Sequence, residues 1–251
     1  FYVRIDKNRK LPITSFIRAI GVETDAEIKE MFGEDERIVA TLEKDAAKTA
    51  EEALIELYKK LRPGEPPTVE SARNLINALF FDTRRYDISA VGRYKYNKKL
   101  NIARRITGRT LAQPAVDPMT GEIIAEEGEV LTRAKAQEIS RRGVHGVVVL
   151  DNDDNEVKVF SNGMVDLKDF VSFDSEAECG IKEKVRFVVL KELLEQNLSD
   201  EELIEKIKEA HDDLIPKHII VDDMLASICY LLNLGHGIGT TDDIDHLGNR
   251  R

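Results

Sequence analysis

Three aspartates and a histidine stand close together near the end of the sequence, and two arginines follow them. The residues are Asp242, Asp243, Asp245, His246, Arg250 and Arg251. Carboxylates with an imidazole can bind a divalent metal ion, as a small metal-dependent nuclease would require. Alternatively, a carboxylate can accept hydrogen bonds from the edge of an unpaired guanine while an arginine holds a phosphate or orients the carboxylate. The arginines favour this second interpretation, with an acidic turn paired internally to Arg250 and Arg251 as the remaining alternative.

Other residues with chemical potential lack the partners that their chemistry requires. The acidic run 151–156 has Glu156 where a calcium loop needs glycine, so we predict a solvated hairpin turn instead. Cys229 falls in an apolar helical pattern without a basic or histidine neighbour, which predicts a core residue. His236 lies between glycines at an expected helix end, where a capping or packing role is favoured. No two histidines have metal-binding spacing, and we predict neither a catalytic residue nor a metal site.

Charge is distributed unevenly along the chain. The formal net charge is −10, yet residues 1–18 carry +4 and residues 82–109 carry +7, which leaves −21 for the remainder. The overall charge argues against a dedicated nucleic-acid-binding protein. Two basic strips on an acidic body could offer phosphates one face and repel them elsewhere. The strips could equally pair with acidic neighbours inside the fold, and the sequence leaves both interpretations open.

The composition is typical of a globular protein. Of the 251 residues, 42% are hydrophobic and 33% are charged. No apolar run approaches the roughly 18 residues needed to cross a membrane. Two cysteines do not make a disulfide framework, which favours a reducing compartment. Neither Phe1 nor Arg251 has the features of a natural terminus, and we interpret the chain as an internal piece of a longer polypeptide.

Capping signals and apolar spacing locate the helices. Thr24 with Glu27 and Ser199 with Glu202 have the spacing of capping boxes. The prolines of segment 62–67 must stop the helix before them. These signals predict helices from Thr24 towards Gly33 and over 50–61, 68–79, 133–141, 200–210 and 223–234, the last capped by Asp222.

Strand signals concentrate in the middle of the chain. Segment 1–13 alternates loosely and is expected to be one extended strand that ends at Pro12. The turn signature Asp117–Gly121 predicts a hairpin, and segments 147–150 and 156–160 predict a second pair of strands. The expected fold class is therefore α+β, predominantly helical, with a small β-rich subdomain inserted between helical parts.

Four stretches of the sequence resemble the bacterial RNA polymerase β subunit, in the order that family has them. The match is nearly letter for letter in the last of them. The stretches are Val3–Pro12, Leu61–Thr68, Arg85–Arg93 and Asp242–Arg251. The hairpin around Asp117–Glu122 and its insert look like the shorter lobe of Firmicutes-type enzymes, whereas 143–220 resembles the family only loosely.

The resemblance implies the lobe region, a wall of the channel that receives downstream DNA. It implies a helical lobe over 21–109 and 190–237, a β-rich insert over 110–189, and segments 1–20 and 238–251 that join the protrusion domain. In the family, a flipped guanine of the nontemplate strand is captured by positions matching Ile244, Asp245 and Arg250. Asp245 would accept from the base edge, and the other two would shape and support the pocket. Positions matching Asp6, Arg62 and Arg85 lie near the same strand.

The resemblance also implies partners and cofactors. The partners would be DNA, as nontemplate strand and downstream duplex, the β′, α and ω subunits, and sigma factor, with no membrane. The family's catalytic Mg²⁺ is held by β′, so this chain would hold no cofactor and no catalytic site of the nucleotidyltransferase. The location implied is the cytoplasm, in association with the nucleoid. An alternative is a platform on which transcription factors dock, without direct DNA contact.

Overall fold

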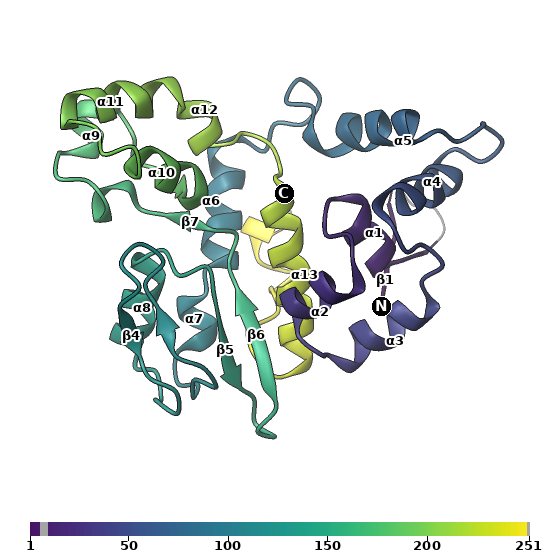
Figure 1. The fold of residues 1–251 in the computed structure, drawn as a ribbon, viewed down its shortest axis with the longest axis horizontal. Helices are drawn as coiled ribbons and strands as arrows, with labels where there is room; N and C mark the ends of the chain where they lie inside the picture. Colours follow the sequence, from purple (N-terminus) through teal and green to yellow (C-terminus); the bar gives the residue numbers. More distant parts are fainter. Residues whose placement is uncertain (6–9, 250–251) are drawn as a thin grey trace. The chain divides into compact units, whose positions relative to one another are not determined.

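Two units make up the part of the chain that is described. We analysed a computed structural model, which describes residues 1–5 and 10–249 (Figure 1). One unit comprises Phe1–Arg93 and Pro216–Leu225, and the other comprises Tyr94–Ile215 and Ala226–Arg251. The division falls within the helices α6, Ser89–Leu100, and α13, Val221–Gly235. The three-part division expected from the sequence, with boundaries near 20, 109, 189 and 237, differs from this one and stays a prediction.

The first unit is helical apart from one short hairpin. Its strands β1 (Tyr2–Val3) and β2 (Leu11–Pro12) pair antiparallel, with Val3 opposite Leu11. The segment is therefore not the single extended strand expected over 1–13. The helices that follow are α1 (Ile13–Ala19), α2 (Asp25–Phe32), α3 (Glu36–Lys44), α4 (Ala50–Leu61), α5 (Val69–Ile76) and the π-helical turn η1 (Asn77–Phe81).

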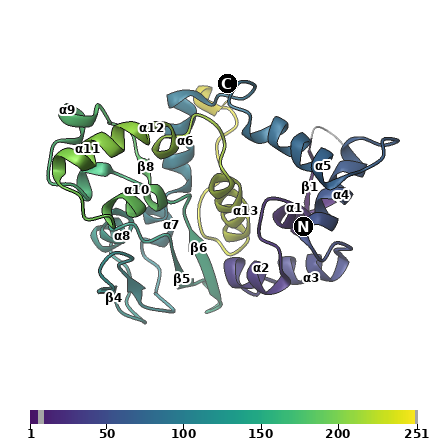
Figure 2. The same cartoon turned by 45° about the horizontal axis from the view of Figure 1, so that its top comes forward.

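Threonine caps start α2, α4 and α5. Thr24 and Glu27 form the predicted capping box, and the hydroxyl groups of Thr49 and Thr68 accept from backbone N–H groups in the first turns of α4 and α5. The prolines after Leu61 end α4 as expected. Helix α1 packs against α4 around the fully buried Ile17 and Ala53, an arrangement visible in both views (Figures 1 and 2).

The second unit contains the other strands and two hydrophobic cores. Its elements in chain order are α7 (Ala103–Ile106), β3 (Ala115–Val116), β4 (Ile123–Ala125), α8 (Arg133–Arg141), β5 (Gly146–Leu150), β6 (Glu156–Phe160), β7 (Met164–Val165), the 3-10 turn η2 (Leu167–Asp169), α9 (Ser175–Cys179), β8 (Val185–Arg186), α10 (Phe187–Leu194), α11 (Asp200–Glu209), α12 (His211–Leu214) and the 3-10 turn η3 (Leu247–Asn249). Within the described residues the strands form two-stranded sheets only, β3 with β4, β5 with β6 and β7 with β8. The α+β class with helix in excess is confirmed.

The two cores of this unit correspond to a β-rich part and a helical part. The first core joins α7 and α8 to the strands β3–β6, with Leu131, Val149 and Val159 almost completely buried. The second joins β7 and β8 to α10–α12 around Leu190 and Ile207. In Figures 1 and 2, α7 and α8 lie beside β5 and β6, and α9–α12 lie together. The predicted hairpins and the helix 133–141 are confirmed.

The N-terminal end of α13 differs from the sequence-based expectation. The helix begins at Val221, so Asp222 lies inside its first turn rather than before it. Asp223 instead accepts from the N–H of Ile220 at 3.1 Å. The same carboxylate accepts from Arg93 at 2.8 and 2.9 Å. Asp223, rather than the predicted Asp222, therefore accepts the hydrogen bond at the start of the helix, because the same carboxylate must pair with the buried guanidinium of Arg93.

Three arginines of the basic strips are buried. Arg18 donates to Asp25 and Asp45, and Arg93 donates to Asp223 and to the carbonyl of Pro216. Arg105 donates to the carbonyls of Leu100 at 2.8 Å and Phe160 at 2.7 Å, and to the side-chain oxygen of Asn233 at 3.0 Å. The prediction that basic residues pair with acidic neighbours inside the fold is correct for Arg18 and Arg93, whereas Arg105 is paired with neutral oxygens. Removing one partner of such a buried pair typically costs about 3–5 kcal/mol.

The acidic run 151–156 forms the turn between β5 and β6, as predicted. Asp151 is buried and accepts from the backbone N–H groups of Asp153 and Asn155, both at 2.9 Å. His236 Nδ1 lies 2.8 Å from the same carboxylate. Burial by itself would raise the pKa of Asp151, but the hydrogen bonds from Asn155 and His236 outweigh it and hold the pKa well below its usual range.

Replacing Asp151 should therefore destabilise the protein in a pH-dependent way. Asp151→Asn is expected to lower the free energy of unfolding at pH 7 by about 1–3 kcal/mol, because an amide nitrogen would face the donors. The deficit should shrink as pH falls below about 4, where the unfolded aspartate binds a proton while the native carboxylate resists it. Urea unfolding from pH 3 to 7 measures this. Asp153→Asn, in the same turn, is the control, and equal curves for both variants would contradict the assignment.

Candidate nucleic-acid interface

Residues 243–249 form a turn that is closed by its own hydrogen bonds. The Asp243 carboxylate accepts from the N–H of Asp245 at 2.9 Å, and the Asp243 carbonyl accepts from the side chain of Asn249 at 2.7 Å. The N–H of Asn249 donates to the carbonyl of His246 at 2.9 Å. These bonds fix the backbone while Ile244 and Leu247 remain 79% and 81% exposed. The turn thus presents apolar side chains to solvent without a core of its own beneath them.

A lysine of α6 anchors the start of this segment. Lys99 Nζ donates to the carbonyl of Thr240 at 2.8 Å and to Asp242 Oδ1 at 2.7 Å. It also lies 4.7 Å from the centre of the Tyr230 ring. Partial burial opposes the charge on Lys99, but hydrogen bonding to Asp242 and Tyr230 outweighs it and raises the pKa of Lys99. The lysine therefore carries its charge throughout the neutral range.

Two further contacts hold the segment. The Tyr230 hydroxyl accepts from the N–H of Thr240 and donates to the carbonyl of the same residue, both at 2.9 Å. At the far end, Lys95 Nζ donates to the carbonyl of Gly248. Lys95 and Lys99 are one helical turn apart on α6, so a single helix face contacts both ends of the segment.

Two of the predicted site residues of this unit are described by the structure, and both lie on the surface. Ile244 and Asp245 are adjacent and exposed in the turn. Arg250 lies outside the described residues, as does Asp6. Asp245 is thus a surface residue and does not lie inside a core.

The other two predicted residues belong to the first unit. Arg62 follows α4 and is exposed at the Pro-rich turn, where its carbonyl accepts from the N–H of Glu65 at 3.4 Å. The Tyr58 hydroxyl donates to Glu65 at 2.7 Å, which ties the turn to α4. The side chain of Arg85 is 71% exposed, and its Nε lies 3.5 Å from Asp82. Such an exposed pair leaves the guanidinium accessible to phosphate.

The basic strips therefore separate into buried and exposed members. The side chain of Arg84 is 91% exposed beside Arg85, whereas Arg93 and Arg105 are buried. A hydrogen bond from the N–H of Arg84 and the charges of the two arginines lower the pKa of Asp82. The internal-pairing interpretation thus applies to buried members of the strips, and the phosphate-contact interpretation stays a prediction for the exposed ones. The exposed arginines have the properties that phosphate contacts require.

The acidic cluster at the end of the sequence is not arranged as a metal site. Among the described residues, no group of three or more His, Cys, Asp or Glu side chains converges as metal ligands would. Asp242 is engaged by Lys99, and Asp243 accepts within its own turn. This arrangement gives no support to the nuclease alternative. In the same part of the chain, no helix has the length and apolar character to cross a membrane.

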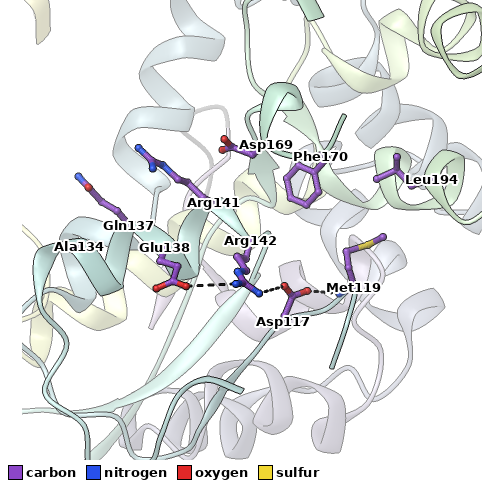
Figure 3. Close-up of a pocket in the computed structure, with 10 residues that line it drawn as sticks. All are labelled: Asp117, Met119, Ala134, Gln137, Glu138, Arg141, Arg142, Asp169, Phe170 and Leu194. Carbon is purple, nitrogen blue, oxygen red and sulfur yellow. Dashed lines mark hydrogen bonds and ion pairs between the residues drawn. The ribbon is translucent and has the colours of Figure 1, made fainter. Parts of the chain in front are cut away.

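A pocket of about 700 Å³ in the second unit is lined by residues of both its β-rich part and its helical part (Figure 3). Met119, Phe170 and Leu194 form its apolar side. Arg142 reaches between Asp117 and Glu138, at 3.1 and 3.7 Å. Neither the sequence nor the resemblance assigned a role to this region. The carboxylates of the pocket outnumber its guanidinium groups, and its lining selects no single class of ligand.

Lys95, Lys99 and Tyr230 are the residues that sequence reasoning missed. Each contacts the segment 240–249, and the two lysines do so across more than a hundred residues of chain. No local motif predicts such contacts. The available signals were two lysines four residues apart and, far along the chain, a run rich in carboxylates.

Comparison with known proteins relates the chain to a family. The family described as RNA polymerase Rpb2, domain 2, matches residues 1–115 and 167–251. The DNA-directed RNA polymerase subunit beta of Acetivibrio thermocellus is 55% identical over 251 residues, which is 99% of this chain and 20% of that protein. The subunits of Clostridium acetobutylicum and Clostridium tetani are 54% and 56% identical, each over 100% of this chain and 20% of their own length. The chain spans about a fifth of these relatives.

The contact between Tyr230 and Thr240 can be tested by hydrogen exchange. Tyr230→Phe removes the oxygen that accepts from the Thr240 N–H, so exchange in a peptide covering 236–243 should accelerate about tenfold, as loss of one protecting hydrogen bond implies. Tyr94→Phe, an exposed tyrosine of α6, is the control and should leave that peptide unchanged. Equal exchange in wild type and Tyr230→Phe would show that the hydroxyl does not hold the segment.

Proposed function

The chain belongs to the RNA polymerase Rpb2 domain 2 family, and from this premise we propose that it forms a wall of the downstream DNA channel in a bacterial RNA polymerase. It would act as part of the β subunit, contacting the nontemplate strand and downstream DNA without making or breaking bonds. Its partners would be the β′, α and ω subunits and sigma factor, in the cytoplasm. Catalytic Mg²⁺ would be held by β′, and the described residues of this chain contain no converging ligand set for it.

The observation that carries the proposal is the exposed turn 243–249. A base can be read only by groups that reach it, and Ile244 and Asp245 are both on the surface. A carboxylate can accept from the amino and imino groups of an unpaired guanine. An exposed apolar side chain beside it supplies a surface against which the base can pack. Arg250 would complete the pocket, together with residues outside this chain.

The exposed arginines of the first unit support the same function by a different mechanism. The side chains of Arg84 and Arg85 are 91% and 71% exposed, and each lies 3.5 Å from the carboxylate of Asp82. Contacts of this kind with phosphates position DNA without reading its sequence. Arg62, at the end of α4, is held near a turn that Tyr58 fastens, and we propose the same role for it. Asp6 is proposed on the resemblance alone.

The alternative of a protein-docking platform has one observation in its favour. The pocket of Figure 3 combines the apolar side chains Met119, Phe170 and Leu194 with charged groups at its edge, which is the composition of many protein-binding surfaces. The two functions do not exclude each other, because the pocket and the turn 243–249 use different residues. DNA binding by variants of the residues proposed to contact DNA distinguishes the two functions, because a docking platform without DNA contact predicts no change.

Base recognition by Asp245 can be measured in the assembled polymerase. Asp245→Ala should weaken the preference for guanine at one nontemplate position by about 1–3 kcal/mol, the usual worth of a base contact. Open-complex lifetimes on promoters that differ only in that base give the preference. Asp213→Ala, at an exposed carboxylate of α12, is the matched control. If the unmutated enzyme binds all four bases equally, Asp245 has no such role.

Phosphate contact by the exposed arginines predicts a change in salt dependence. The double variant Arg84→Ala with Arg85→Ala should loosen downstream DNA and reduce the slope of log affinity against log salt by about 2, because two counterion-releasing contacts are lost. Arg73→Ala, at an exposed position of α5, controls for a general loss of charge. An unaltered slope in the double variant would show that these arginines serve the fold instead.

A further inference from the structure

The turn 243–249 has little apolar packing to hold it in place. Ile244 and Leu247 face solvent, and the only regular element of the segment is the short turn η3. Internal hydrogen bonds give the turn a shape but do not fix its position on the unit. Its position must therefore come from contacts with other elements. Polar contacts from α6 and α13 reach the segment 240–249.

The contacts converge on the approach to the turn. Lys99 binds the carbonyl of Thr240 and the carboxylate of Asp242, and Tyr230 binds both backbone polar groups of Thr240. Four hydrogen bonds thus act on two residues, Thr240 and Asp242, which lie four and two positions before Ile244. A residue held at its N–H, its carbonyl and a neighbouring side chain has little freedom to rotate. The orientation in which the chain enters the turn is set there.

The groups that make these contacts are themselves fixed. The ring of Tyr230 lies 5.1 Å from the guanidinium of Arg105 and 4.7 Å from the ammonium of Lys99. Arg105 is held by the carbonyls of Leu100 and Phe160. Gly239 has a φ of +97°, and a Cβ there would lie 3.0 Å from the Tyr230 ring and hydroxyl. The backbone therefore approaches the tyrosine as closely as only glycine allows.

We propose that Lys99 and Tyr230 are positioning residues for base recognition, which orient Ile244 and Asp245 towards the nontemplate guanine by fixing Thr240 and Asp242. The inference rests on the proposed function. The side chain of Lys99 is one third exposed and that of Asp242 is 62% exposed, so this pair contributes little to stability. Its effect is geometric, and it should appear in discrimination between bases more than in overall DNA affinity.

The test uses RNA polymerase assembled with variant β subunits. Open complexes are formed on promoters with G, A, C or T at the nontemplate position where the unmutated enzyme prefers guanine, and the lifetime ratio of G to T is measured. Lys99→Met keeps the aliphatic stem over Tyr230 but removes the donors, and Tyr230→Phe removes the hydroxyl. Each should lower the ratio by about three- to tenfold, the scale of one or two lost hydrogen bonds.

Three controls separate positioning from other effects. Lys98→Met, whose ammonium lies 5.9 Å from the ring of Tyr94, should keep the G-to-T ratio whatever it does to overall affinity. Lys99→Arg retains charge and donors and should restore most of the ratio. In the double variant of Lys99→Met with Asp245→Ala, the ratio should fall no further than in Asp245→Ala alone, because both changes act on the same contact.

The outcomes distinguish the inference from the function on which it rests. If Asp245→Ala abolishes the ratio while Lys99→Met and Tyr230→Phe leave it unchanged, the positioning role is overturned and the proposed function stands. If Lys99→Met shortens all four lifetimes equally, Lys99 contacts phosphate and the positioning role is again overturned. If Asp245→Ala itself leaves the ratio unchanged, the proposed base contact fails first.

Discussion

The burial of three guanidinium groups determines how much of the positive charge of the two basic strips remains at the surface. An arginine side chain removed from water must be surrounded by acceptors, because it cannot lose its proton. Arg18, Arg93 and Arg105 are surrounded in this way by carboxylates, carbonyls and an amide oxygen, with exposures of 0–4%. Each of these residues joins segments that are distant in the chain or holds a helix against a loop. They build the scaffold, so the positive charge left for DNA is smaller than the sequence suggests.

Four exposed or partly exposed basic residues of the second strip fall into two groups with different contacts. Lys95 and Lys99 bind carbonyl and carboxylate oxygens of the segment 240–249 and so hold that segment in place. Arg84 and Arg85 extend into solvent from a turn next to Asp82 and are accessible to phosphate. The net charge of −10 therefore coexists with local positive charge on exposed side chains.

Local signals predicted the local structure well and the long-range structure poorly. The capping boxes at Thr24 and Ser199, the helix 133–141 and the hairpin 146–160 follow from residues a few positions apart, and all are confirmed. The start of α13 was predicted two residues too late, and the capping acceptor is Asp223 rather than Asp222, because Asp223 pairs with Arg93, 130 residues away. Ile244 and Asp245 are exposed, and their role stays a prediction. The anchoring by Lys99 and Tyr230 could not be predicted for the same reason. Contacts between distant polar side chains leave no periodicity in a sequence.

The β-rich part of the second unit is linked to the rest of that unit by buried hydrogen bonds. Residues 116–166 lie outside the part that the family description matches. Yet the carbonyl of Phe160 accepts from Arg105, and the carbonyl of Lys158 accepts from Asn233 at 2.9 Å. Both donors belong to the matched portion. Removing residues 158–160 would take away one acceptor from each of these two donors, so the stability of the matched portion depends in part on the segment between its two pieces.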